Sequence, residues 1–283
     1  MFEYIFGILT FLVFRNYLTI FIVKRRLKKI SKVKNEMRPI QMRGKKRKVV
    51  LLIHGFSSSP GEFRYLSNFL NKRGFAVVAP LLSGHGTSPE NLTIVKKEMW
   101  IRDCEMEVKK LEEKYDEIIL VGNSMGGSLS LIISNCSKKI KGVVVISTPM
   151  IYNLKNRFFN LIFPIMHRIK FRQKKKYGRK FKERVGKERI DAYNSVPLKG
   201  VLQLVKVIKF AKKNLKKVEK PILICQARDD EAMDSESAKY IYENVSSENK
   251  KIFLVEDSIH MVLLDPLRND LLNNEILKFV EGV

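Results

Sequence analysis

Short apolar runs alternate with amphipathic segments from residue 49 to the C-terminus, and this alternation constrains the fold more than any other feature. The runs are typical of strands buried on both faces, and the segments between them have helical periodicity. Strands are predicted at residues 49–53, 75–79, 118–121, 142–146, 222–225 and 251–255, and helices near residues 62–72, 93–114, 124–135, 235–245 and 266–280. We therefore expect an α/β fold, with a mostly parallel sheet, helices on both faces and functional loops at the carboxyl ends of the strands.

The alternation stops at residues 150–217, where basic and apolar residues compatible with helices take over. We expect a helical cap of residues 150–217 inserted into one domain of residues 49–283. Residues 157–171 carry more apolar side chains than one helical face needs. These side chains either pack the cap onto the body, or they line a tunnel for an acyl chain or dip into lipid.

The net charge of +25 is concentrated in two segments. Residues 24–48 contain 13 Lys or Arg and one Glu, and residues 150–217 contain 21 Lys or Arg and three acidic residues. The remaining residues are slightly acidic as a whole. Charge confined in this way differs from that of a uniformly basic nucleic-acid-binding domain, and no nucleic-acid-binding motif is present, so we expect no nucleic-acid partner.

The first 23 residues are almost entirely apolar and are followed directly by KRRLKK. Glu3 precedes the apolar run and no small-residue cleavage site follows it, which argues against a secretory signal peptide. We expect residues 1–23 to form a membrane anchor, either spanning or interfacial; a helix that packs on the protein is the third alternative. Arg15 costs roughly 2.5–3.5 kcal/mol near mid-bilayer, which the surrounding apolar side chains can offset. Residues 24–48 are expected to be a basic linker on the cytoplasmic side, against anionic headgroups.

Three cysteines, Cys104, Cys136 and Cys225, are widely spaced along the chain. An odd number without metal-binding spacing predicts neither a disulfide framework nor a zinc site, and it favours a reducing compartment. No cluster of metal ligands is visible elsewhere, so no metal is expected.

The stretch IILVGNSMGG, residues 118–127, passes from a buried strand into a helix with almost no room to turn. A turn this sharp strains the residue at its apex and presses backbone segments together, which explains the glycines on both sides. Ser124 is left projecting from the apex. The Gly-x-Ser-x-Gly spacing is a weak signal alone, because glycine-bounded serines also occur in ordinary turns.

A serine hydroxyl is a poor nucleophile unless a base lies within hydrogen-bond reach and an acid orients that base. His260 follows the last predicted strand, where a base can reach back over the sheet to Ser124. An orienting carboxylate is expected in the loop after the preceding strand, which offers Asp229, Asp230, Glu231 and Asp234. The chain order Ser, Asp, His is then satisfied.

Attack by Ser124 on an ester carbonyl creates an oxyanion that needs preorganised donors. The backbone N–H of Met125, at the start of a helix, is one expected donor. The N–H of Phe56, in the loop LLIHGFSSSP after the first strand, is the other. The other histidines are expected to act structurally: His54 and His85 in loops, and His167 in the basic cap.

These residues together resemble the α/β-hydrolases, specifically the carboxylesterase and monoacylglycerol-lipase-like branch. The resemblance runs from about Val49 to the C-terminus, and it rests on LLIHGFSSSP, LLSGHGTSPENL, residues 100–103, VGNSMGG, QARDDEAMDSESA and SIHMVLLDPLRNDL in family order. It implies an acyl-serine mechanism without a cofactor, with Ser124 as nucleophile, His260 as base and acid, and Asp230 as the residue that orients it. Two departures are Ile259, where the family usually has glycine, and the basicity of the cap.

We therefore expect a serine carboxylic ester hydrolase, a carboxylesterase or a lipase for monoacylglycerol or lysolipid, held at the cytoplasmic membrane face. A small ester or lipid is the expected substrate, and an anionic membrane surface the expected partner. An acyltransferase or thioesterase uses the same residues. A membrane-tethered scaffold that has lost its chemistry, and nucleic-acid binding through the basic segments, are the alternatives from other classes.

Overall fold

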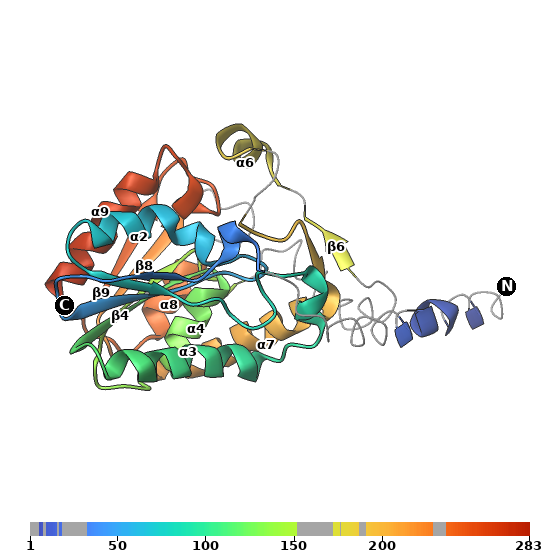
Figure 1. Cartoon of the computed structure of the whole chain (residues 1–283), viewed down its shortest axis with the longest axis horizontal. Coiled ribbons are helices and arrows are strands. Elements are labelled where there is room, and N and C mark those ends of the chain that lie inside the picture. The colour runs from blue at the N-terminus through green and yellow to red at the C-terminus, as the bar shows by residue number, and fades with distance from the viewer. Residues whose placement is uncertain are drawn as a thin grey trace.

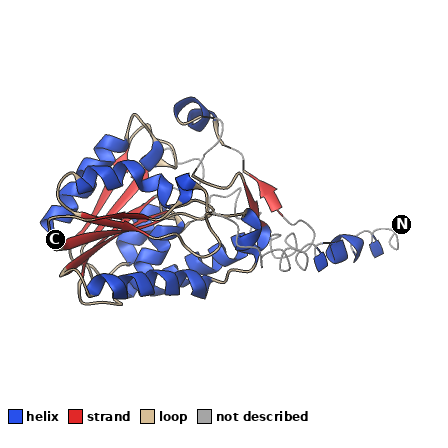
Figure 2. Cartoon of the chain, in the orientation of Figure 1, coloured by secondary structure: helices blue, strands red, loops and turns tan. Residues whose placement is uncertain are grey.

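The computed structural model describes residues 6–7, 10–15, 17–18, 33–151, 172–175, 177–186, 191–228 and 236–283. Within these residues the chain forms three layers, a central sheet with helices on both faces (Figures 1 and 2). The α/β architecture expected from the sequence is confirmed.

The central sheet of the described residues has seven strands in the order β1-β3-β2-β4-β5-β8-β9. All neighbouring pairs are parallel except β1 with β3. The strands are β1 Ile40–Met42, β2 Lys48–Ile53, β3 Ala76–Ala79, β4 Glu117–Asn123, β5 Ile140–Ile146, β8 Ile222–Ala227 and β9 Lys250–Val255. Every strand predicted from residue 49 onward is present, within a few residues of its expected bounds.

Two sets of helices cover the two faces of the sheet. On one face lie α3 Lys97–Glu112, α4 Met125–Ile133, α7 Leu198–Asn214 and α8 Glu236–Asn244, and on the other lie α2 Arg64–Asn71 and α9 Asn269–Gly282. Short 3₁₀ turns complete the description: η1 Asn35–Met37, η2 Pro60–Phe63, η3 Pro89–Thr93, η4 Leu215–Lys217 and η5 Val262–Leu264. Each helix predicted from residue 49 onward has a counterpart among these elements.

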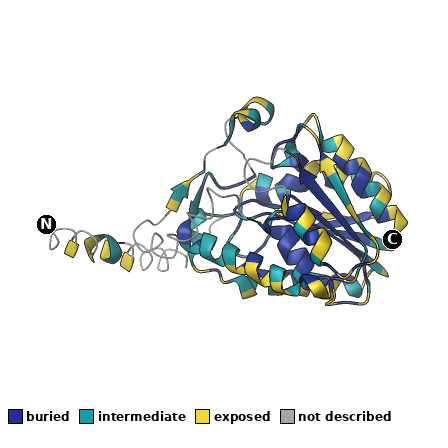
Figure 3. Ribbon diagram, turned by 180° about the vertical axis from the view of Figure 1, so that it is seen from behind, coloured by how far each residue is buried: buried dark blue, intermediate teal, exposed yellow. Residues whose placement is uncertain are grey.

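Alternate residues of the central strands pack into two separate hydrophobic cores, one on each face of the sheet. In β2, Val49, Leu51 and Ile53 face the α3 and α4 side, whereas Val50 and Leu52 face the α2 and α9 side, and all five are fully buried. A strand buried on both faces needs an unbroken apolar run, which is why these segments were recognisable in the sequence. Figure 3 shows the buried strands between helices whose outer faces are exposed.

Part of the segment expected to be a linker belongs to the sheet instead. Residues Ile40–Met42, within the expected linker 24–48, form the antiparallel edge strand β1 against β3. Ile40 and Met42 pack partly buried against the α2 and α9 core, while Gln41 points out. An edge strand with one partner can be this short, so three alternating residues gave no strand signal among the surrounding lysines.

The expected cap of residues 150–217 also differs from the structure in two respects. The described part contains a two-stranded antiparallel sheet, β6 Arg172–Lys174 with β7 Ser195–Pro197, besides the short helix α6 Arg179–Arg184. Its last helix, α7, packs on α4 and contributes Val207 and Ala211 to the core of the body. The apolar stretch 157–171 lies outside the described residues.

Most of the expected membrane anchor, residues 1–23, also lies outside the described residues. Residues 10–15 are helical, and Phe11 and Phe14 are exposed. Among the residues that were described, no helix is both long and apolar enough to cross a bilayer.

Candidate active site

Ser124 stands at the sharp turn between β4 and α4, as the sequence predicts. Its backbone has φ 52° and ψ −115°, a combination that a residue with a side chain rarely adopts. The turn is close-packed, because a Cβ on Gly126 would collide with the carbonyl of Ile53. Strain and close approach of this kind are what present the serine side chain beyond the carboxyl end of the sheet.

A buried carboxylate ties the loop after β2 to the serine turn. Glu62, in η2, is 2% exposed, and its Oε1 accepts hydrogen bonds from the Gly55 N–H at 2.9 Å and from Asn123 Nδ2 at 3.0 Å. Ser58 Oγ donates to Glu62 Oε2 at 2.5 Å. Glu62 therefore joins the residue before Phe56 to the residue before Ser124.

Two buried histidines connect the loop after β2 to the loop after β3. His54 Nε2 accepts from the Leu82 N–H at 3.1 Å, and His85 Nε2 accepts from the Ser57 N–H at 3.0 Å. Each Nδ1 faces backbone carbonyls, so each ring is neutral with its proton on Nδ1. Burial, together with the neighbouring His54, lowers the pKa of His85 well below its usual value. The structural roles predicted for His54 and His85 are confirmed.

A pocket of about 300 Å³ lies over this end of the sheet. Its lining includes Ser124 and Asn123 from the serine turn, and half-buried His260. The remaining lining is mixed, with polar residues beside apolar ones: Gly55, Phe56, Ser57, Ser58, Glu62, Lys175, Tyr177, Val196, Val201, Leu204 and Met261. Elements far apart in the sequence thus meet around one cavity.

The structure brings most of the sequence-predicted site together. Ser124, His260 and Phe56 line the same pocket, and Met125 is buried directly after Ser124 as the first residue of α4. Asp230 lies outside the described residues, as do Asp229, Glu231, Asp234 and His167.

A second, larger depression of about 570 Å³ lies at the amino ends of the strands, away from Ser124. Its charged walls are paired with one another, as in Arg47 with Asp116 and Lys48 with Glu117. The smaller pocket is the candidate active site, because a strained serine and a histidine line it.

Several pocket residues were missed by sequence reasoning, among them Glu62, Lys175 and Tyr177. Glu62 was interpreted only as the start of a helix, and Lys175 and Tyr177 only as part of the basic cap. An acid eight residues after His54 was the available signal for Glu62. No local pattern marks Lys175 or Tyr177, since they reach the pocket through the fold of the cap.

The described residues contain no group of three or more His, Cys, Asp or Glu side chains placed to hold a metal ion. Cys104, Cys136 and Cys225 are free thiols, two of them buried and Cys136 exposed. Burial raises the pKa of the Cys104 and Cys225 thiols.

A parallel sheet of this order, with a strained serine between strand and helix and a histidine beyond the last strand, defines an α/β-hydrolase. The model of the family described as serine aminopeptidase, S33, matches residues 44–267. The chain belongs to this family.

Characterised relatives extend over most of the chain. A carboxylesterase of Bacillus subtilis is 30% identical over 235 residues, which are 83% of this chain and 92% of the relative. A thermostable monoacylglycerol lipase of a Bacillus species is 29% identical over 220 residues, which are 76% of this chain and 84% of the relative. With the family match, these relatives show that the chain is an enzyme of the serine ester hydrolase class.

Solved structures agree on the fold. A metagenome-derived lipolytic enzyme superposes with a TM-score of 0.79 at 24% identity, covering 89% of this chain and 100% of that one. The monoacylglycerol lipase of Paleococcus ferrophilus superposes with a TM-score of 0.73 at 20% identity, covering 86% and 97%.

Proposed function

We propose that the chain hydrolyses carboxylic esters through an acyl-serine intermediate, with Ser124 as the nucleophile. The observation that carries the proposal is that Ser124, on a strained turn, lines the same pocket as His260. His260 takes the hydroxyl proton as Ser124 Oγ attacks the carbonyl carbon, and it returns that proton to the leaving alcohol. Asp230, in the segment after β8, orients the imidazole. Water then repeats the sequence and releases the acid.

Two backbone amides stabilise the tetrahedral oxyanion in this proposal, those of Phe56 and Met125. Met125 begins α4, so its N–H lies at the positive end of a helix. Phe56 lines the pocket, and the Glu62 carboxylate holds the residue before it. One donor of this kind is worth roughly 2.7–4 kcal/mol of transition-state stabilisation.

The proposed substrate is a monoacylglycerol, a lysolipid or another ester of short to medium chain length. Apolar side chains in the pocket lining suit an acyl chain: Phe56, Val196, Val201, Leu204 and Met261. Lys175, Tyr177 and the serine side chains in the same lining suit a polar head group. A lining that contains both kinds of side chain suits an amphiphilic ester.

We also propose that the enzyme works at the cytoplasmic face of an anionic membrane, attached through residues 1–23. Exposed aromatic rings among the described residues of this segment support the proposal, namely Phe6, Phe11, Phe14 and Tyr17. The basic segment 24–48 adds electrostatic attraction to anionic headgroups.

Replacing the proposed nucleophile or base tests the mechanism. We expect Ser124→Ala and His260→Ala each to lower kcat for a p-nitrophenyl ester by about 10⁴- to 10⁶-fold while circular dichroism stays native. Ser130→Ala is the matched control, since this buried serine lies on α4 and donates to the Gly126 carbonyl outside the pocket. Retention of most activity by either variant would show that the assignment is wrong.

The purified wild type and the Ser124→Ala variant also distinguish ester hydrolysis from the alternative functions. A fluorophosphonate probe should label the wild type and leave Ser124→Ala unlabelled; an unlabelled wild type would favour a scaffold without chemistry. Product analysis with added alcohol or thiol acceptors distinguishes hydrolysis from acyl transfer, because only a transferase forms the new ester or thioester in preference to the acid.

A further inference from the structure

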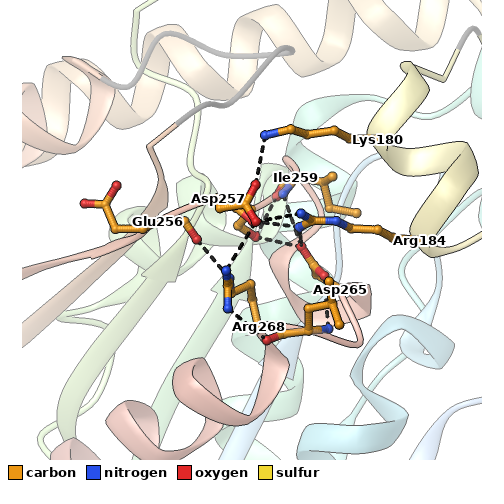
Figure 4. A network of polar contacts seen from close by, with 9 residues as sticks. Lys180, Arg184, Glu256, Asp257, Ile259, Asp265 and Arg268 are labelled. Atoms are coloured by element: carbon orange, nitrogen blue, oxygen red, sulfur yellow. Dashed lines mark hydrogen bonds and ion pairs between the residues drawn. The ribbon is translucent and has the colours of Figure 1, made fainter.

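A cluster of charged side chains joins helix α6 of the cap to the loop that carries His260 (Figure 4). This base loop, residues 256–261, runs from the end of β9 to η5. Arg184 and Lys180 extend from α6 towards it, and Asp265 and Arg268 lie on the other side of it. The cluster lies outside the lining of the pocket and is not used in the proposed mechanism.

Arg184 contacts the base loop and Asp265 at the same time. Its Nη1 donates to the backbone carbonyl of Asp257 at 2.6 Å and to Asp265 Oδ2 at 2.8 Å, and its Nη2 donates to Asp257 Oδ2 at 2.8 Å. The planar guanidinium group presents several donors in a fixed arrangement, so it can hold three acceptors where an ammonium group holds them less rigidly. The Arg184 side chain is 15% exposed.

Asp265 fixes the base loop from within. Its side chain is fully buried, and Oδ2 also accepts from Ser258 Oγ at 3.2 Å and from the Ile259 N–H at 3.4 Å. On the other side of His260, Oδ1 accepts from the Leu267 N–H at 3.2 Å. One buried carboxylate therefore holds chain segments before and after the histidine, and Arg184 supplies a countercharge.

Asp257 completes the connection on the exposed side. It has a left-handed backbone, with φ 46°, and its carboxylate meets Lys180 at 3.0 Å and Arg268 at 3.2 Å besides Arg184. These cations hold the backbone of the base loop three residues before His260.

We propose that Arg184 and Asp265 are positioning residues that fix the His260 loop and make its geometry depend on the seating of α6. The proposal rests on His260 being the base of the proposed function. A base must lie within hydrogen-bond reach of the serine, and a displacement of about 1 Å can cost about 100-fold in rate. Residues that hydrogen-bond the loop of a catalytic base preserve its geometry, because they remove alternative orientations of that loop.

The test compares two arginines of the same helix. Arg184→Met removes the connection, and Arg179→Met is the matched control, because Arg179 pairs with Glu183 on α6 and its side chain is 91% exposed. We expect Arg184→Met to lower kcat for a p-nitrophenyl ester about 10- to 100-fold, with KM changed less than about twofold and fluorophosphonate labelling slowed in parallel. Arg179→Met should match the wild type in all three.

A conservative variant keeps the test decisive if Arg184→Met does not fold. Arg184→Lys retains the countercharge for Asp265, so we expect it to fold. It loses the planar guanidinium group that donates to three acceptors, so we expect kcat to fall at least threefold. Equal kcat for Arg184→Lys, Arg179→Lys and the wild type would overturn the proposal. A higher KM with unchanged kcat in the Arg184 variants would overturn it as well. A wild type that neither hydrolyses esters nor reacts with the probe would refute the proposed function itself, a result distinct from these.

Discussion

At the scale of single residues, buried carboxylates organise both loops of the candidate site. Glu62 holds the loop after β2 through the Gly55 N–H, and Asp265 holds the base loop through the Ile259 N–H. A buried carboxylate destabilises the folded state unless its oxygens are hydrogen-bonded. Each of these two acids accepts hydrogen bonds from several donors. Both therefore fix backbone that carries a proposed functional group.

Glu62 gives the first prediction at this scale. Glu62→Ala leaves the Gly55 N–H and Asn123 Nδ2 without their buried acceptor, at a cost of roughly 1–3 kcal/mol for each group. We expect a lower unfolding temperature and a kcat reduced about 10- to 100-fold, because the neighbouring Phe56 donor loses its fixed position. Steady-state kinetics on a p-nitrophenyl ester and thermal unfolding measure the two effects.

Glu62→Gln is the informative companion. It keeps an amide oxygen for both donors, and the Ser58 hydroxyl can rotate to accept from the new NH₂ group. Its kcat should lie within a few-fold of the wild type. If Gln and Ala impair kcat equally, the negative charge of Glu62 matters rather than its acceptor geometry, and our account of the loop fails.

At the scale of elements, the sequence predicts those helices and strands whose residues follow a regular local pattern. Strands β2, β4, β5 and β8 each contain an unbroken apolar run because these residues are buried on both faces, so their positions follow from the local sequence alone. The short strands β1, β6 and β7 have no such signature, since each is only three residues long. Their existence depends on which segment lies beside them.

The candidate site divides in the same way. Ser124 was found because a strained turn needs glycines close by in the sequence, and His260 because it follows a recognisable strand. Glu62 and Arg184 were not found, because their partners lie 61 and 81 residues away in Asn123 and Asp265. Contacts across such separations leave no periodic pattern. The role of Asp230 stays a prediction.

Docking of α6 should depend on pH through Asp257. Hydrogen bonds from Lys180 and then Arg184 lower the pKa of Asp257 to about 2, below the value of about 3.9 in an unfolded chain. Because the folded pKa is the lower one, its stabilisation is fully present above pH about 4 and is lost as pH falls through about 2. The unfolding temperature of the wild type should therefore exceed that of Asp257→Asn above pH 4.

The two unfolding temperatures should converge as the pH falls towards 2, since the protonated wild-type side chain is then as neutral as asparagine. Asparagine tolerates the left-handed backbone at this position, so the comparison isolates the charge. A difference between wild type and variant that stayed constant from pH 6 to pH 2 would contradict the ion pairs drawn in Figure 4.

At the scale of the whole molecule, the basic charge is concentrated in two segments of the chain. The net charge of +25 comes from residues 24–48 and 150–217, whereas the rest of the chain is slightly acidic. A described contact joins residues 1–23 to the basic segment 150–217. Lys199 Nζ, in α7, lies 5.7 Å from the centroid of the Tyr17 ring.

The described lining of the pocket includes no residue of the segment 1–23, so we expect attachment and catalysis to be independent. Removing residues 1–23 takes away the exposed aromatic rings of that segment and leaves the sheet, the pocket and the charged cluster intact. We expect the shortened protein to move from the membrane fraction to the supernatant, with kcat/KM for a short aryl ester within about twofold of the full chain. Fractionation with and without a wash at about 1 M salt measures the attachment, because salt at that concentration screens headgroup attraction beyond about 3 Å. The full chain should resist the wash, since apolar contact with lipid is not screened. If the shortened protein also stays on the membrane through the wash, the attachment lies in the cap, and the role we propose for residues 1–23 is wrong.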